Sequence, residues 1–200
     1  MKIINRVYQF KISLRDIEPV IWRKIQVPVN YSFWDLHVAI QDSMGWLDYH
    51  LHQFTIKKPY AHKATEIGIP NDRGYNDIEI LAGWKVDISS FFTDLGVTAL
   101  YQYDFGDGWE HDVTLEGVLI KEKGVKYPRC IDGGRKCPPE DCGGIPGYFE
   151  FLEDVLNPSH EENARMIEWY GSKYEPDEFA STKVRFDNPK KRWKTAFQNK

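Results

Sequence analysis

The chain has 200 residues, of which 42% are hydrophobic and 28% charged, a mixture typical of a globular protein with a sizeable core. Its formal charge of −4 argues against a dedicated nucleic-acid-binding protein, because such proteins bind phosphates through clustered Lys and Arg. No segment reaches the ~20 apolar residues that cross a bilayer, and the N-terminus lacks the apolar core of a signal peptide, so we expect a cytoplasmic protein without a membrane partner.

The N-terminal quarter alternates between strand and helix signals. Apolar residues at every second position predict strands at 8–14 and 20–27, separated by a turn and arranged as a hairpin. Ser32 is a typical N-cap for a helix over 33–44, whose apolar residues repeat at helical spacing. Alternation returns at 51–57, which we interpret as a third strand.

The middle of the chain has one strong hairpin signal, which follows a weak stretch. Residues 58–83 are interrupted by Pro, Asn and Gly, and they predict an irregular excursion with one short strand at 78–81. A short helix is expected at 88–95. The segments 98–105 and 109–120 are rich in β-branched and aromatic residues, and the glycines between them supply a turn. This pair is the clearest hairpin in the sequence.

The last third of the chain changes from loop to helix. Residues 121–147 hold all three cysteines together with several Pro and Gly residues, and they predict a loop. Helices are expected at 148–156, at 159–170 and after Pro189. Strands that come as hairpins and are followed by helices predict an α+β fold. We expect an antiparallel β-sheet built from hairpins, with helices packed on it, in a single domain over 1–200.

The turn of the clearest hairpin carries an acidic glycine-rich segment, YDFGDGW at 103–109. The strand period predicts that Tyr101, Tyr103 and Phe105 pack inward and that Asp104 faces away from them. Carboxylates in this segment, with His111 close behind, are suitable ligands for a hard divalent cation. An Asp between glycines is also what a tight hairpin requires, so turn formation alone is a competing explanation.

A second acidic glycine-rich segment, CPPEDCGG, lies at 137–144. Its two prolines stiffen the loop that holds Glu140 and Asp141, which suits pre-organised recognition. The cysteine spacing C-x6-C-x4-C lacks the C-x2-C pair typical of zinc sites, so buried thiols compete with a three-cysteine site completed by His111. If the two acidic segments meet in space, the predicted ligands of a divalent metal are Asp104, Asp107, Glu140 and Asp141.

The histidines are a further group of candidate ligands. His50 and His52 flank Leu51, so in a strand they share one face, where such a pair can bind metal or serve only as polar surface. The chain has no nucleophile elbow, zinc-protease helix, phosphate-binding loop or dinucleotide fingerprint. Standard nucleophilic and nucleotide-dependent enzymes are therefore disfavoured.

Short motifs occur in a distinctive order along the chain. They are PVIWR at 19–23, LH at 36–37, MGW at 44–46, HLHQF at 50–54, YDFGDGWEH at 103–111, CPPEDCGG at 137–144 and GY at 147–148. Together they resemble the plasmid pRiA4b ORF-3-like family over about residues 5–160, which leaves a helical extension over about 160–200. The resemblance implies an α+β fold and a prokaryotic, often mobile-element-associated setting. It implies no activity, because that family has no established biochemical function, and its members often lack a cysteine at the position of Cys142.

Three functions remain open from the sequence alone. The first is a non-catalytic binding or interaction domain for nucleic acid or a mobile-element protein. It is indicated by the family setting, the basic tail at 188–200 and the expected exposure of the aromatic residues Trp46, Trp109 and Trp193. The second is a divalent-metal-assisted hydrolase in which His111 or His52 is the acid–base partner. The third is that both acidic segments are only turns that the fold requires. We favour binding over catalysis. The candidate binding cleft is lined by Asp104, Asp107, Trp109, His111, Glu140, Asp141, His52 and Arg23.

Overall fold

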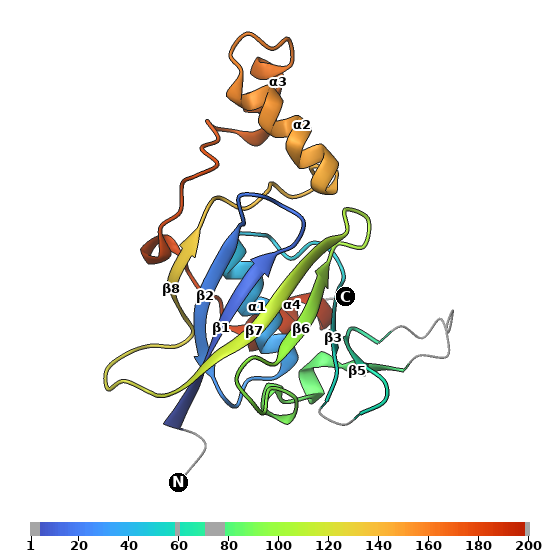
Figure 1. The fold of residues 1–200 in the computed structure, drawn as a ribbon, viewed down its shortest axis with the longest axis vertical. Helices are drawn as coiled ribbons and strands as arrows, with labels where there is room; N and C mark the ends of the chain where they lie inside the picture. Colours follow the sequence, from blue (N-terminus) through green and yellow to red (C-terminus); the bar gives the residue numbers. More distant parts are fainter. Residues whose placement is uncertain (1–4, 59–60, 71–78, 199–200) are drawn as a thin grey trace.

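Eight strands form one continuous sheet in the computed structural model, which describes residues 5–58, 61–70 and 79–198 (Figure 1). The strands are β1 (Arg6–Leu14), β2 (Trp22–Pro28), β3 (His52–Ile56), β4 (Thr65–Gly68), β5 (Ile80–Ala82), β6 (Thr98–Tyr103), β7 (Trp109–Ile120) and β8 (Arg129–Gly134). Their order across the sheet is β5-β4-β3-β6-β7-β1-β2-β8. Neighbouring strands run antiparallel except β4 and β5, which run parallel. The sheet is therefore mixed, which corrects the expectation of a wholly antiparallel sheet at this edge.

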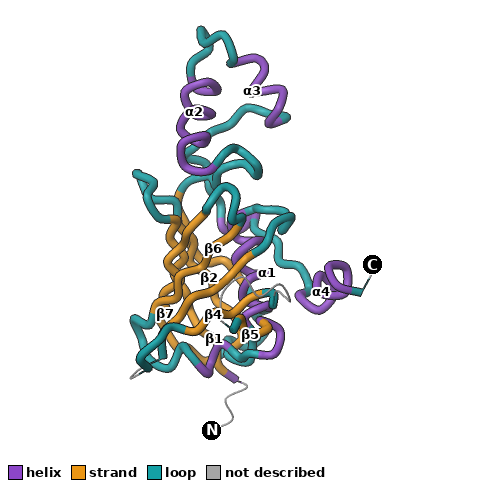
Figure 2. The backbone as a smooth tube through the Cα atoms, turned by 90° about the vertical axis from the view of Figure 1, so that its right-hand side faces the viewer, coloured by secondary structure: helices purple, strands orange, loops and turns teal. Residues whose placement is uncertain are grey.

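The helices lie on one face and beyond one end of the sheet (Figure 2). They are α1 (Phe33–Met44), α2 (Gly144–Leu156), α3 (Asn163–Tyr170) and α4 (Pro189–Phe197), with single 3₁₀ turns at η2 (Gly83–Lys85), η3 (Ile88–Ser90) and η4 (Ser181–Lys183). Helix α1 packs on the sheet, α4 packs against α1, and α2 and α3 form a pair beyond the end of the sheet. Each helix in the described ranges is too short or too polar to span a bilayer. The arrangement is α+β, as the sequence predicts.

Helix α1 has the bounds that its capping signals predict. The Ser32 side chain accepts a hydrogen bond from the Asp35 N–H, and the Asp35 carboxylate accepts one from the Ser32 N–H. This reciprocal pair satisfies two backbone donors that the first turn would leave unpaired. At the other end Gly45 adopts φ 93°, a left-handed conformation in which glycine ends helices without steric cost.

Aromatic side chains fill the layer between α1 and the sheet. Phe33 of α1 packs edge-on against Phe54 of β3, with ring centroids 5.1 Å apart, and Phe10 of β1 packs edge-on against Phe92 at 4.8 Å. All four side chains are fully buried. Edge-to-face pairs of this kind stabilise a core by about 0.5–1.5 kcal/mol each beyond their buried area. The high aromatic content therefore serves mainly the core.

Several elements differ from the sequence prediction. The expected helix at 88–95 is only the 3₁₀ turn η3, and the buried residues Phe91 and Phe92 follow it outside any helix. The expected loop at 121–147 contains β8, and the expected irregular excursion contains β4. Helix α2 begins earlier than predicted and α3 later, so that Glu162 precedes α3. Residues 59–60 and 71–78 of the excursion lie outside the described residues.

Candidate functional site

The two acidic glycine-rich segments meet in space at the end of the sheet that adjoins α2. The Gly143 N–H donates a hydrogen bond to Asp107 Oδ2 at 3.1 Å. Gly144 lies so close to the hairpin turn that a Cβ atom on it would stand 2.4 Å from the Asp107 carbonyl oxygen. The Gly143–Asp107 hydrogen bond joins residues 36 positions apart. The close approach at position 144 requires glycine, because a side chain there would fill the space that the turn occupies.

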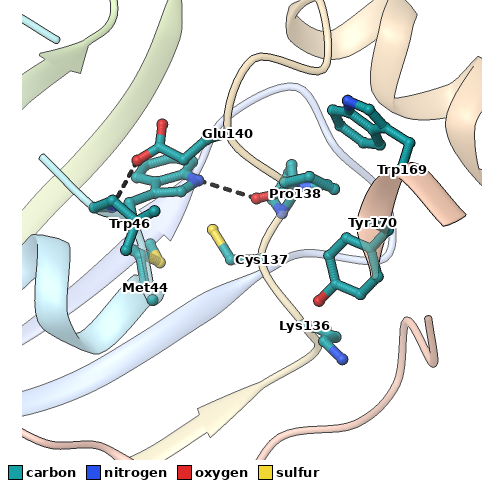
Figure 3. Close-up of a pocket in the computed structure, with 11 residues that line it drawn as sticks. Met44, Trp46, Lys136, Cys137, Pro138, Glu140, Trp169 and Tyr170 are labelled. Carbon is teal, nitrogen blue, oxygen red and sulfur yellow. Dashed lines mark hydrogen bonds between the residues drawn. The ribbon is translucent and has the colours of Figure 1, made fainter. Parts of the chain in front are cut away.

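The segment after α1, residues 46–51, joins the same cluster and anchors Glu140. The Leu47 N–H donates to Glu140 Oε1 at 2.7 Å, and the Tyr103 hydroxyl donates to the same carboxylate at 3.0 Å. The Trp46 indole donates to the Pro138 carbonyl at 2.9 Å (Figure 3). Burial raises the pKa of Glu140, and the donated hydrogen bonds oppose that rise. This carboxylate is therefore held in one position.

His50 lies between two carboxylates that come from the two acidic segments. Its Nε2 atom is 2.9 Å from Asp141 Oδ1 and 3.5 Å from Asp104 Oδ2. Asp104 is only 7% exposed, and its Oδ1 atom accepts a hydrogen bond from the Gly106 N–H at 2.9 Å. Strand β6 ends at Tyr103 and Asp104 adopts φ 52°. That turn explains why Asp104 is buried and Phe105 is 54% exposed, the reverse of the strand-based prediction.

The structure divides the predicted metal ligands into two pairs. Asp104 and Asp141 stand with His50 in a group whose potential ligand atoms all lie within 4.8 Å of one another. Asp107 and Glu140 accept hydrogen bonds from backbone and hydroxyl donors, and neither belongs to the groups of three or more potential ligands found among the described residues. The sequence pairs His50 with His52 on one face of a strand. In the structure β3 begins at His52, and His50 precedes it.

Trp109 and His111 belong to the core below this cluster. Trp109 is 1% exposed and lies beside Trp46, while His111 is fully buried with Nδ1 3.3 Å from the Tyr101 carbonyl oxygen. Burial lowers the pKa of His111 to about 3, so its imidazole is neutral at physiological pH. The expected exposure of Trp46 and Trp109 is therefore wrong, because both indoles are buried.

His52 lies in a second buried cluster beneath α1. Its ring stacks on that of His37, with centroids 3.4 Å apart and planes 9° apart. His37 is hydrogen-bonded to Asp48 through Nε2 and to the Tyr101 hydroxyl through Nδ1, each at 2.8 Å. Two parallel rings cannot both direct an in-plane lone pair at one cation, which argues against metal binding here. Burial and the neighbouring His37 lower the pKa of His52.

Arg23 and the cysteines have structural surroundings. Arg23 is 2% exposed and donates hydrogen bonds to the carbonyl oxygens of Ser43 at 2.8 Å and Gly134 at 2.9 Å. The arginine thus ties β2 to β8 and to the end of α1. All three cysteines are free, none belongs to a potential metal-ligand group among the described residues, and burial raises the pKa of each. The three-cysteine metal site has no support in the structure.

A pocket of about 490 Å³ opens beside the acidic cluster (Figure 3). Its walls come from the end of α1, the 136–140 segment and the end of α3, and the residues that line it are Met44, Gly45, Trp46, Leu47, Lys136, Cys137, Pro138, Pro139, Glu140, Trp169 and Tyr170. Glu140 lies beside Trp46, whereas Lys136 lies below Tyr170. The volume is within the range of small-molecule sites, roughly 300–1,000 Å³.

A second pocket, of about 430 Å³, lies between the start of α1 and α4. Trp34, Trp84 and Trp193 line it, together with Asp35 and Lys190 among other residues. It contains none of the site residues that the sequence predicts. The two pockets are therefore separate candidates that carry different tryptophans.

Comparisons with known proteins give the chain relatives but no activity. A family model described as "Plasmid pRiA4b ORF-3-like protein" matches residues 6–183. An uncharacterised protein of Sinorhizobium fredii, y4hQ, is 35% identical over 170 residues, which are 84% of this chain and 83% of that protein. The crystal structure of a protein of unknown function from Methanosarcina mazei Go1 is similar, with a TM-score of 0.81 and 41% identity over 90% of this chain and 98% of that one.

Proposed function

The chain belongs to the plasmid pRiA4b ORF-3-like family, and we propose that it is a non-catalytic binding domain whose ligand enters the pocket beside the two acidic segments. The observation that carries the proposal is the pocket itself, about 490 Å³ in volume and formed where three separate segments of the chain come together. Pockets of this size with a few fixed polar groups are the usual form of ligand sites.

The lining of the pocket indicates the kind of ligand. Apolar and aromatic side chains form most of its wall, and Trp169 is 48% exposed there. The Lys136 ammonium lies 5.3 Å from the Tyr170 ring centroid and 3.7 Å from Glu178 Oε2, so the pocket has a cation whose ion pair is long. We therefore expect an organic group with an apolar, aromatic body and an anionic end. The same chemistry occurs in small metabolites and in side chains of a partner protein.

The pocket offers little for catalysis. The Cys137 thiol is buried and its pKa is raised by that burial, so it is a poor nucleophile. His111 and His52, the predicted acid–base residues, are buried, and neither is among the described residues that line the pocket. Glu140 is held by hydrogen bonds from two donors, the Leu47 N–H and the Tyr103 hydroxyl. These features favour recognition over chemistry.

The proposal is tested with anilinonaphthalene sulfonate, a fluorescent probe that has aromatic rings and one anionic group. The native protein should bind about one equivalent with a fluorescence increase, and Trp169→Ala should weaken binding about 10-fold, as the loss of an aromatic contact worth about 1.4 kcal/mol requires. Ile120→Ala is the control, because Ile120 is 62% exposed on β7 but does not line the pocket. Absence of binding, or equal effects of the two substitutions, would contradict the proposal.

A second candidate is a divalent-metal-assisted hydrolase, which the grouping of His50, Asp104 and Asp141 favours. In this alternative the metal would activate water, and Glu140, the neighbour of Asp141, would be the acid–base group. Hydrolysis of a chromogenic phosphodiester with Mn²⁺ tests it: the candidate requires activity that Asp141→Asn abolishes. For either candidate function we also propose a cytoplasmic location and a mobile-element setting.

A further inference from the structure

Three side chains from three different segments converge beside the pocket. His50 comes from the segment after α1, Asp104 from the hairpin turn and Asp141 from the second acidic segment. One potential ligand atom from each lies within 4.8 Å of the other two. An imidazole with two carboxylates is a mixed nitrogen and oxygen donor set, which suits Zn²⁺ and Mn²⁺.

The distances in this group match those between ligands of one metal ion. Ligand atoms about 2.1 Å from a cation stand roughly 3.4 Å apart in tetrahedral geometry and roughly 3.0 Å apart in octahedral geometry. His50 Nε2 is 3.5 Å from Asp104 Oδ2 and 2.9 Å from Asp141 Oδ1. Two of the three distances between ligand atoms therefore match those around one cation, and the third is within 4.8 Å.

The ligand atoms are available for a cation. His50 Nε2 is buried and makes no hydrogen bond within the described part of the chain, although Asp141 Oδ1 is close to it. Asp104 is a nine-tenths buried side chain whose Oδ1 accepts the hydrogen bonds from the Gly106 and Asp107 backbone N–H groups. Its Oδ2 atom is the one nearest His50. At 3.5 Å, His50 Nε2 and Asp104 Oδ2 are farther apart than the roughly 2.7–3.2 Å of a usual hydrogen bond, so a cation between them can pair with both atoms.

The geometry points to a divalent cation bound by His50, Asp104 and Asp141. Three protein ligands leave at least one coordination position open, as in sites where a metal contacts a ligand. The Asp141 side chain is 63% exposed, so a cation can reach the group from solvent. Because Asp141 follows Glu140 in the chain, the cation would fix the loop that forms one wall of the pocket. The inference does not depend on what the pocket binds.

The experiment is a calorimetric titration of ZnCl₂ and MnCl₂ into full-length protein that carries no affinity tag and has been stripped with a chelator. One equivalent of at least one cation should bind, and His50→Gln and Asp141→Asn should each weaken that binding by about 10- to 100-fold or more. Because Asp141 is exposed, its amide variant should keep the wild-type melting temperature in the absence of metal. Asp104→Asn, at a buried position, can fail to fold, and in that case Asp141→Asn still tests the site.

A matched control is present elsewhere in the chain. His160 Nδ1 lies 2.9 Å from Asp154 Oδ1, an ordinary pair of the same residue types. His160→Gln should leave cation binding unchanged. The inference is overturned by failure of both cations to bind, or by binding that His50→Gln and Asp141→Asn leave unchanged. The anilinonaphthalene sulfonate assay of the pocket is run without metal. Failure of the pocket proposal and failure of the cation-site inference can therefore be told apart.

Discussion

Gly144→Ala tests the contact that brings the two acidic segments together. Gly144 has φ 68°, and a Cβ atom there would lie 2.4 Å from the Asp107 carbonyl oxygen. Left-handed backbone costs alanine about 1–2 kcal/mol. Cβ atoms essentially never approach closer than 3.0 Å, so the hairpin turn must move by about 0.6 Å, a displacement that adds about 1–3 kcal/mol. The expected loss of unfolding free energy is therefore about 3 kcal/mol.

The control for this substitution is Gly124→Ala. Gly124 has φ 82°, but a Cβ atom there would have no neighbour within 4 Å, so only the left-handed backbone cost applies. Urea unfolding followed by tryptophan fluorescence should show a loss of about 1 kcal/mol for this control. Gly144→Ala should also weaken cation binding, because it separates Asp104 from Asp141. Equal losses of stability in the two variants would refute the close approach of the segments.

Three further predictions concern the buried polar residues and the tail. The pKa of His111 is about 3 in the folded state and about 6.5 in the unfolded state. As the pH falls below about 6.5, the unfolded state therefore binds a proton at His111 that the folded state does not bind. Acidification from pH 7 to 5 should thus remove about 2 kcal/mol of stability that depends on His111, a loss absent from His111→Gln. Arg23→Met should cost about 4 kcal/mol in urea unfolding, since it leaves the carbonyl partners of a buried guanidinium unpaired. If DNA binds to the tail, filter binding should show a salt slope that falls by about 2 in a Lys190→Ala, Lys191→Ala double variant.

Each of these predictions has a result that contradicts it. A pH dependence that is the same in His111→Gln and the wild type would show that His111 is protonated in the folded protein above pH 5. A cost below about 1 kcal/mol for Arg23→Met would mean that its hydrogen bonds add little to stability. No retention of DNA on the filter at low salt would exclude the nucleic-acid version of the binding function.

Elements with local signals are predictable from the sequence. Helix α1 has its predicted bounds, because Ser32 and Gly45 cap it through contacts with residues only a few positions away. The β6–β7 hairpin is also as predicted, because its turn lies between two strands rich in β-branched and aromatic residues. Strand β8 gives no such signal: it contains two glycines and lacks alternation, and it is a strand because it pairs with β2.

The site could be predicted only in part, because its geometry depends on contacts between distant segments. The sequence indicates Asp104 and Asp141 as candidate ligands but cannot show that they meet. It also places His50 in a strand with His52, whereas His50 precedes β3 and turns towards Asp141. Asp107 and Glu140 have the right chemistry for metal ligands, yet tertiary hydrogen bonds from Gly143 and Tyr103 engage them.

The pocket proposal is tested most directly by NMR of the tryptophan indole N–H groups during titration with anilinonaphthalene sulfonate. The seven tryptophans report on different places: Trp46 and Trp169 line the pocket beside the acidic segments, whereas Trp84 and Trp193 line the pocket beside α4. The proposed function predicts that the Trp46 and Trp169 resonances shift while those of Trp84 and Trp193 stay in place. Shifts confined to Trp84 and Trp193 would contradict it and assign ligand binding to the α4 pocket.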